Sequence, residues 1–242
     1  MTAFASQLRA ELKVLLRNGE QLLLTIIIPV MLLVFFSTVD VLPTGDVAES
    51  VDFLTPGVLA LAVMSSAMVS LGISTGFERG YKVLKRLGVT PLGRGRWIAA
   101  KVVSIITVEV LQMIVLVGVA LALGWDADNA QWLPAVGAVA VGTVAFGGLG
   151  LLIAGRLRAE INLAAQNGLY LVLLLLGGMV IPFDELPDGV AAVAKCLPSG
   201  ALADVVRDTL VGGADRPATS WLVLGIWAVA TPVLAALTFR WE

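Results

Sequence analysis

Long apolar segments alternate with shorter polar ones over most of the chain. Six of them stand out, at Leu22–Val39, Pro56–Gly76, Ile98–Leu123, Leu133–Ala154, Leu163–Ile181 and Ser220–Phe239. About 20 apolar residues cross a bilayer as a helix, and backbone groups in lipid must pair within their own segment. The pattern therefore predicts an all-α polytopic membrane protein with six transmembrane helices, built as a single transmembrane domain over residues 1–242.

Residues 1–20 predict a helix of a different kind. Apolar side chains recur at helical spacing on one face and basic side chains on another: Phe4, Leu8, Leu12, Leu15 and Leu16 against Arg9, Lys13 and Arg17. Such a helix lies in the plane of the membrane interface before the chain enters the bilayer. A basic tail without regular structure is the alternative interpretation.

Composition agrees with a membrane protein, and the distribution of charge gives it an orientation. Hydrophobic residues make up 58% of the chain and charged residues 14%, against roughly 25% charged in soluble domains. With the N-terminus inside, thirteen of the sixteen Lys and Arg fall in cytoplasmic segments and three in outer ones. The positive-inside rule then predicts a multi-pass protein of the cell inner (plasma) membrane with both termini cytoplasmic. The basic charge lies against anionic lipid, so the bilayer is an expected partner and nucleic acid is not.

The densest basic segment lies between the second and third predicted spans. Glu78 to Lys101 carries seven of the sixteen Lys and Arg. Its apolar residues predict one face of a short helix, which the breakers Gly88 and Pro91 would end. Two interpretations of the cytoplasmic loop 78–96 stay open. It is either a surface that another protein binds, or a loop whose charge only sets the topology.

The segment between the fifth and sixth spans is irregular. Residues 182–213 contain two apolar helical stretches, about Gly189–Cys196 and Ala201–Val211, on either side of Pro198-Ser199-Gly200. Each stretch is too short to cross a bilayer, which is typical of re-entrant pieces. The sequence therefore predicts a helical hairpin that dips into the outer leaflet. A plain extracellular loop is the alternative.

Glu109 is the one acidic residue within a predicted span, and Gln112 follows one helical turn later. An ionisable group at such depth is costly and suggests a function. A structural or pathway-lining role for this intramembrane polar pair is favoured, because the interior of the spans offers no second acid, Lys, Arg or His for a proton relay. Proton binding by Glu109 is the alternative.

Small and polar residues mark two of the other spans. The second span carries Gly72 and Gly76 beside a stripe of small residues, which predicts close helix packing within one chain rather than a dimer seam. The fifth span begins with polar side chains that a solvated helix start would explain, with a polar vestibule as the alternative: Asn162, Gln166 and Asn167.

Several kinds of chemistry are excluded by what the sequence lacks. Gly72-Ile73-Ser74-Thr75-Gly76 matches the G-x-S-x-G pattern of serine hydrolases, but the chain has no histidine to act as the base. One cysteine and no histidine make a structural zinc site very improbable, and no phosphate-binding G-x-x-x-x-G-K-[ST] loop is present. We therefore expect no catalytic, cofactor-binding or metal-binding residues, and no enzymatic activity, in this chain.

Two motifs resemble those of the ABC-2 type transporter permeases, in particular the bacterial drug-exporter branch typified by daunorubicin-resistance permeases. The first is Glu78-Arg79-Gly80 followed by Leu84-Lys85-Arg86-Leu87 and Thr90-Pro91-Leu92. The second is Gly177-Gly178, Pro182, Leu186-Pro187 and Leu197-Pro198, with Arg207 in the stretch that follows. The resemblance covers nearly the whole chain.

The resemblance implies roles that the residues alone did not give. The loop after the second span would be a coupling helix that docks on a separate cytoplasmic ATPase, through Glu78, Arg79, Lys82, Lys85, Arg86, Leu87 and Pro91. The hairpin would form an outer re-entrant gate that includes Pro182, Leu186, Pro187, Pro198 and Arg207. Two ATPase copies, which bind ATP and Mg, would join two permease subunits as a homodimer or heterodimer.

The expected function is then the permease subunit of an ATP-binding-cassette exporter for a lipophilic or amphipathic substrate, a drug or a lipid. Alternatives are a polysaccharide or lipid-linked glycan export permease of the same architecture and a proton-coupled carrier that uses Glu109. A membrane partner that transports nothing, such as an immunity or sensor protein, is a further class.

Overall fold

The computed structural model describes residues 3–17, 19–39, 47–84, 93–211 and 217–240. Within these ranges the regular structure is helical, and no strand occurs in them. The elements are α1 (Ala3–Arg17), α2 (Gly19–Thr38), α3 (Val47–Met64), the π-helix η1 (Ser65–Ser70), α4 (Leu71–Gly80), α6 (Gly93–Ala122), α7 (Trp132–Ala154), α8 (Ala159–Leu176), the 3-10 helix η2 (Phe183–Glu185), α9 (Asp188–Ala194), α10 (Pro198–Leu210) and α11 (Pro217–Thr238). The predicted all-α fold is confirmed over the described residues.

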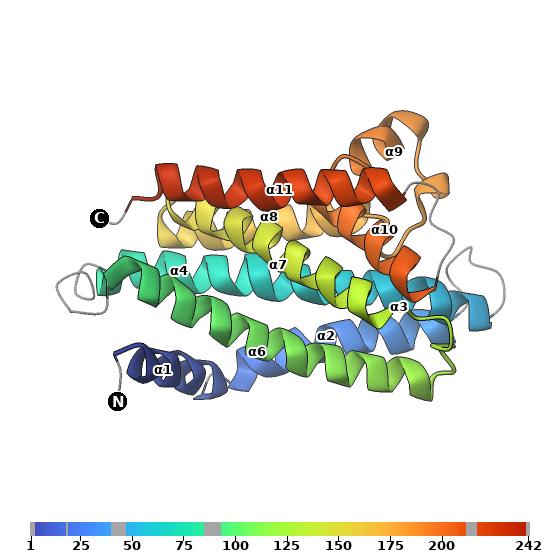
Figure 1. Ribbon diagram of the computed structural model, residues 1–242, viewed down its shortest axis with the longest axis horizontal. Helices are drawn as coiled ribbons and strands as arrows, with labels where there is room; N and C mark the ends of the chain where they lie inside the picture. The colour runs from blue at the N-terminus through green and yellow to red at the C-terminus, as the bar shows by residue number, and fades with distance from the viewer. Residues whose placement is uncertain (1–2, 18, 40–46, 85–92, 212–216, 241–242) are drawn as a thin grey trace.

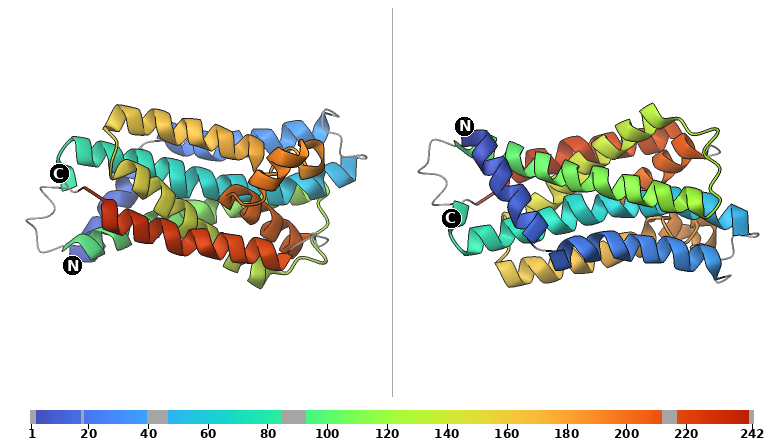
Figure 2. Two further views of the ribbon diagram at one scale, coloured as in Figure 1. Left: turned by 90° about the horizontal axis from the view of Figure 1, so that it is seen from above. Right: turned by 90° about the horizontal axis from the view of Figure 1, so that it is seen from below.

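The helices form an elongated bundle that has both termini at one end (Figure 1). Its long members are α2, the continuous helix α3–η1–α4, α6, α7, α8 and α11, and successive ones run in opposite directions. We call the end with both termini the N/C end and the opposite end the far end. α1 packs beside α6 at the N/C end, whereas α9 and α10 lie toward the far end (Figures 1 and 2).

The helix α3–η1–α4 is the centre of the bundle. It packs against α2, α6, α7, α8 and α10, and its apolar part is 72% buried, against 17–39% for the other long apolar helices. Its side chains from Val58 to Met64 are almost completely enclosed. The outward faces of α6, α8 and α11 instead present large aliphatic side chains, as helices surrounded by lipid do.

Five helices of the described chain are long and apolar enough to cross a membrane: Ser50–Gly80, Gly95–Ala122, Trp132–Ala154, Ala159–Leu176 and Ala218–Thr238. They coincide with five of the six predicted spans. The remaining predicted span lies on α2, whose described apolar part, Thr25–Thr38, is shorter. A sixth candidate arises if α9 and α10, which are bent by 81° at their junction, are counted as one broken span. The protein thus has the helices of a multi-pass membrane protein.

A π-helical turn interrupts the central helix at its midpoint. Ser65–Ser70 adopt the wider i→i+5 spacing, with regular α-helix on both sides. The hydroxyls of Ser65 and Ser66 donate to the carbonyl of Ala62, at 3.0 and 2.9 Å. Single π-helical turns are rare and occur often at functional sites, so this turn marks the middle of the central helix as a place to look for function.

Candidate functional site

An ion triad ties three helices together at the N/C end. The Lys101 ammonium on α6 lies 2.6 Å from Glu78 Oε1 on α4 and 3.2 Å from Glu11 Oε2 on α1. The side chains are mostly enclosed, with exposures of 5% for Lys101, 11% for Glu11 and 25% for Glu78. Charges so buried are stable only when they are paired, so both carboxylates depend on the Lys101 ammonium that lies between them.

A small hydrophobic cluster around Trp97 lies next to the triad. Trp97, one turn before Lys101 on α6, is buried against Leu84, with Ile98 and Phe239 packed beside them. The Lys101 ammonium also lies 5.5 Å from the centre of the Trp97 ring, within the range of a cation–π contact. Leu84, which follows the end of α4, is therefore anchored to α6 and to the end of α11.

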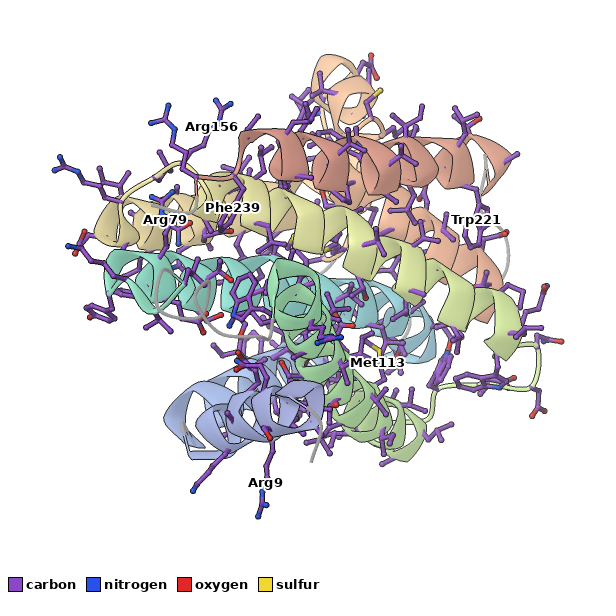
Figure 3. All side chains as sticks on the ribbon, turned by 60° about the vertical axis from the view of Figure 1, so that its left-hand side comes forward. Arg9, Arg79, Met113, Arg156, Trp221 and Phe239 are labelled. Carbon is purple, nitrogen blue, oxygen red and sulfur yellow. The ribbon has the colours of Figure 1, made fainter. Side chains whose placement is uncertain are left out.

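Arg79 connects α4 to the turn between α7 and α8. Its two terminal nitrogens donate to the carbonyls of Gly155 and Leu157. The Gly155 carbonyl also accepts the backbone N–H of Arg240, at 3.1 Å. Figure 3 shows Arg79 near Phe239 and the turn that carries Arg156. Arg79 thus fixes the end of α4 to the α7–α8 turn, and the shared Gly155 carbonyl links this turn to the residues that follow α11.

We call the ion triad, the cluster around Trp97 and the contacts of Arg79 together the N/C junction. Lys82, just after α4, is exposed and adopts a positive φ of 59°, a backbone conformation that does not continue the helix. The remaining predicted coupling residues, Lys85, Arg86, Leu87 and Pro91, lie outside the described residues. Of the seven predicted coupling residues, the structure therefore places Glu78 and Arg79 in the packed base of the loop and Lys82 at its surface.

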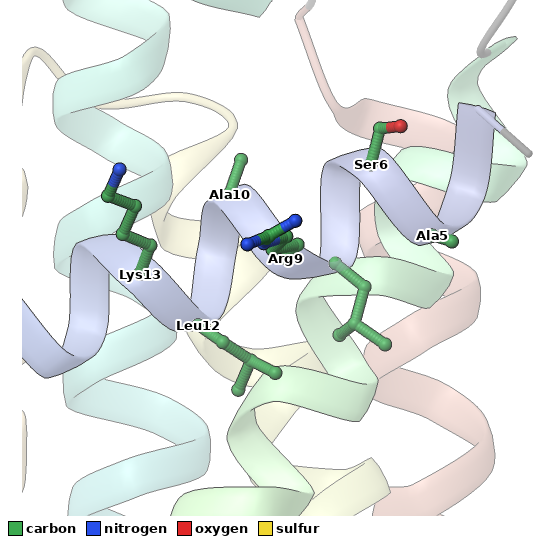
Figure 4. A pocket seen from close by; sticks show the side chains of 7 residues that line it. Ala5, Ser6, Arg9, Ala10, Leu12 and Lys13 are labelled. Carbon is green, nitrogen blue, oxygen red and sulfur yellow. The ribbon is translucent and has the colours of Figure 1, made fainter. Parts of the chain in front are cut away.

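A shallow groove lies against α1 at the same end. Its volume is about 740 Å³, and Figure 4 shows the side chains that line it: Ala5, Ser6, Leu8, Arg9, Ala10, Leu12 and Lys13. The Arg9 side chain points away from the bundle (Figure 3). Arg9 and Lys13, together with Arg156 and Arg158, make the N/C end rich in exposed positive charge.

A second cavity opens on the side of the bundle between α2, the central helix and α8. It has a volume of about 400 Å³ and is lined by Thr25, Ile28, Pro29, Ser65, Val69, Ser70, Ile73, Leu163, Asn167 and Tyr170. We call it the lateral groove. Most of its wall is apolar, with a few hydroxyl and amide groups. A groove with that lining suits a ligand that is largely apolar and carries a few polar atoms.

Glu109 and Gln112 lie inside the bundle and are not among the residues that line the lateral groove. Glu109 Oε1 lies 2.9 Å from Ser66 Oγ of η1, and Oε2 lies 2.8 Å from Thr143 Oγ1 of α7, both within hydrogen-bond distance. The Gln112 amide donates to the carbonyl of Thr25 on α2, at 2.8 Å. The two predicted intramembrane polar residues therefore connect α6 with three of its neighbours.

Asn162 and Gln166 are structural residues that the sequence interpretation placed wrongly. Both are fully buried, unlike side chains at a solvated helix start. Asn162 donates to the carbonyl of Gly72 at 2.9 Å, and Gln166 to that of Gly150 at 3.0 Å. A Cβ on Gly72 would lie 2.0 Å from the Gln166 amide. The side chains of α8 thus pack directly against the glycines of the second span, in agreement with packing within one subunit.

The predicted outer gate residues fall into two groups at the far end. Pro198 is buried at the first turn of α10, and Arg207 on that helix donates to the Gly178 carbonyl at 3.0 Å. The Arg207 guanidinium also lies 4.2 Å from the ring centre of Phe53 on α3. The others, Pro182, Leu186 and Pro187, surround the 3-10 helix η2 and the start of α9, where they are more exposed.

The structure thus assembles one site from distant parts of the chain and leaves others separate. Glu78 and Arg79 join Lys101, Glu11 and the α7–α8 turn at the N/C end; Glu109 and Gln112 lie within the spans; Arg207 lies at the far end. Sequence reasoning missed Glu11, and it counted Lys101 only as one of the seven basic residues of the segment Glu78–Lys101. The described residues contain no group of three or more His, Cys, Asp or Glu placed to hold a metal ion.

Comparison with known proteins gives two results. A family described as ABC-2 type transporter matches residues 2–211. A protein of Bacillus subtilis (strain 168) named "Putative transport permease YvfS" is 27% identical over 215 residues, which cover 88% of this chain and 87% of that protein. The family match includes the residues of the ion triad, Arg79, the lining of the lateral groove, and both Glu109 and Gln112.

Proposed function

The chain belongs to the ABC-2 type transporter family, and from this premise we propose that it is the membrane-spanning permease subunit of an ATP-binding-cassette exporter. The substrate is a lipophilic or amphipathic molecule, a drug or a lipid, and the energy comes from ATP hydrolysed with Mg²⁺ on a separate ATPase. The observation that carries the proposal is the N/C junction, where the root of the basic loop is fixed to several spans at once.

The N/C end faces the cytoplasm of the cell, in this proposal, and the far end faces outward. The support is electrostatic, because exposed Arg and Lys side chains gather at the N/C end and cytoplasmic loops carry such an excess. α1, with apolar residues toward α6 and Arg9 and Lys13 outward, lies at the inner membrane interface. The α9–α10 pair, bent by 81°, is the re-entrant hairpin of the outer leaflet.

The segment 78–96 transmits motion from the ATPase to the spans. A partner shifts a conformational equilibrium only through contacts that differ between the two states, and those contacts must reach the pore. The Glu78–Lys101–Glu11 triad and the Arg79 contacts supply the rigid link, since they join α4, α6, α1 and the α7–α8 turn. Lys82, Lys85, Arg86, Leu87 and Pro91 then form the surface on which an ATPase docks, one ATPase for each of two permeases.

The substrate passes along the lateral groove, in this proposal, between this chain and a second permease subunit, identical or related. The groove opens on the flank formed by α2 and α8, where the exposed residues include Ile28, Met31 and Leu171. A second subunit placed there would close it. The sparse polar atoms of the wall suit an amphipathic molecule, whereas a glycan needs many more hydrogen-bonding partners along its path. Arg207, held to Gly178 and Phe53, positions the outer gate.

The test is ATP-driven transport by the full chain together with a candidate ATPase taken from the same gene cluster. The complex is reconstituted in proteoliposomes, and uptake of daunorubicin or of a fluorescent phospholipid is measured with the N/C end and the ATPase outside. We expect ATP-dependent accumulation of one of these probes. Accumulation that does not depend on ATP, or its absence from a complex that hydrolyses ATP at a normal rate, would contradict the proposal.

A matched pair of variants tests the coupling route. Arg79→Lys keeps the charge but loses one of the two hydrogen bonds to the α7–α8 turn, so the complex should assemble while substrate no longer stimulates ATP hydrolysis fully. Arg158→Lys makes the same chemical change at an exposed position and should leave both rates unchanged. Equal behaviour of the two variants would show that the contact with the turn carries no coupling.

A further inference from the structure

Glu109 lies at a junction of three membrane-spanning helices. Its carboxyl oxygens extend from α6 to Ser66 Oγ of η1, at 2.9 Å, and to Thr143 Oγ1 of α7, at 2.8 Å. The side chain is almost completely enclosed, with the residue 3% exposed. None of the ion pairs among the described residues includes it. The acid therefore has two hydroxyl neighbours and no cation.

The two hydroxyls have other partners at the same distances. Ser66 Oγ lies 2.9 Å from the carbonyl of Ala62, and Thr143 Oγ1 lies 2.8 Å from that of Val139, each within its own helix. A hydroxyl donates one hydrogen and accepts others, while an ionised carboxylate only accepts. Each hydroxyl therefore lies close to two oxygen atoms, which makes four pairs of oxygens. With Glu109 ionised, only the two hydroxyl hydrogens are available for these four pairs. A proton on Glu109 adds a third hydrogen, so that three of the four pairs can be hydrogen-bonded.

The charges of the surrounding helices do not compensate an ionised Glu109. α7 contains no Asp, Glu, Lys or Arg. On the central helix, the described ionisable groups Asp52, Glu78 and Arg79 lie three or more turns from Ser66. Lys101 on α6 is about 12 Å away along the helix axis and is already bound to Glu78 and Glu11. An unpaired carboxylate buried in the membrane is strongly disfavoured.

We propose that Glu109 is a proton-binding site, and that its protonated carboxyl holds α6 against the π-helical turn and α7. The acid O–H donates to Ser66 Oγ, whose own hydrogen goes to the Ala62 carbonyl. The other carboxyl oxygen accepts from Thr143. A movement that separates α6 from η1 removes this acceptor and exposes the carboxyl, so the movement releases the proton. The site does not depend on the transport proposal, since its evidence is local to the three helices.

Infrared spectroscopy tests the proposal directly. The full chain is purified at pH 7 in dodecyl maltoside, a detergent without carbonyl groups, and the C=O stretching band of a non-ionised carboxylic acid is sought. We expect this band in the wild type, its loss in Glu109→Gln, and its retention in Glu160→Gln, a control at an exposed acid of α8. A wild type without the band, or a band that survives in Glu109→Gln, would overturn the proposal.

A second variant keeps the test decisive if Glu109→Gln does not fold. Ser66→Ala removes the acceptor of the proposed O–H hydrogen bond, so the acid band should move to higher frequency. An unshifted band in Ser66→Ala would contradict the geometry. Where Glu109→Gln does fold, its amide can donate to Ser66 and accept from Thr143. Its melting temperature should then equal that of the wild type, whereas the melting temperature of Glu109→Leu should be lower.

Discussion

Removal of the Lys101 charge is the sharpest perturbation of the N/C junction. In Lys101→Met the long side chain keeps its apolar stem but no longer carries the ammonium that lies 2.6 Å from Glu78 and 3.2 Å from Glu11. Two carboxylates from different helices are then left facing each other in a mostly enclosed space. The variant should therefore destabilise the contacts of α1 and α4 with α6.

The size of the effect follows from how deeply the triad is buried. Breaking a buried ion pair by removing one partner costs about 3–5 kcal/mol. Water reaches Glu78, which is 25% exposed, so we take the lower end of that range. We expect Lys101→Met to lower the free energy of unfolding by about 3 kcal/mol, which corresponds to roughly a 150-fold change in the unfolding equilibrium.

A double-mutant cycle separates the charge interaction from the loss of packing. Glu78→Gln alone leaves Lys101 paired with Glu11 and should cost about 1 kcal/mol. The double variant Glu78→Gln/Lys101→Met no longer strands the Glu78 charge, so its cost should fall below the sum of the single costs by about 1–3 kcal/mol. Lys82→Met, at an exposed cation in the same region, is the matched control and should stay within about 0.5 kcal/mol.

Equilibrium unfolding in mixed micelles with increasing dodecyl sulfate, followed by tryptophan fluorescence, measures these differences. The reasoning would be refuted by additive effects of the two substitutions, or by a Lys101→Met variant as stable as Lys82→Met. Either result would mean that the triad is too well solvated to act as the rigid base of the loop.

Two other substitutions test the packing of the central helix. Gly76→Ala would place its Cβ 2.3 Å from the Asn162 amide nitrogen, so we expect the free energy of unfolding in detergent to fall by about 1–3 kcal/mol. The control Gly168→Ala, where nothing lies within 4 Å of the added Cβ, should be neutral or stabilising. Equal melting temperatures of the two variants would contradict this packing. Phe53→Leu removes the ring whose centre lies 4.2 Å from the Arg207 guanidinium and should lower the free energy of unfolding by about 0.5–2 kcal/mol. The same substitution in an Arg207→Met background should have a smaller effect, because the cation is already absent.

Hydropathy predicted the positions of the spans well because it is a local property of the chain. The predicted Leu133–Ala154 differs from α7 (Trp132–Ala154) by one residue, and the predicted third span from α6 by a few. The fifth span was shifted. Its polar first turn hid the start of α8, and the apolar run continued past Gly178, whose positive φ of 62° follows the end of the helix.

Contacts between distant residues were beyond the reach of the sequence pattern. Glu11 and Lys101 are 90 positions apart, and nothing in either segment identifies the other as a partner. Asn162 and Gln166 were expected at a solvated helix start because polar residues usually lie there, but the glycines of α4 let α8 approach and bury them. The π-helical turn at Ser65–Ser70 leaves no recognisable sequence signal.

In the proposed function, a separate ATPase drives this permease through the basic loop 78–96. The full chain is purified in nanodiscs with a candidate ATPase from the same gene cluster, and ATP turnover is measured for the wild type and for a variant in which Lys82, Lys85 and Arg86 are replaced by Gln. We expect a stable complex with the wild type, and loss of binding and of substrate-stimulated turnover in the variant. A well-folded wild-type chain that binds no ATPase, or a variant that binds and stimulates it as the wild type does, would contradict the proposed function.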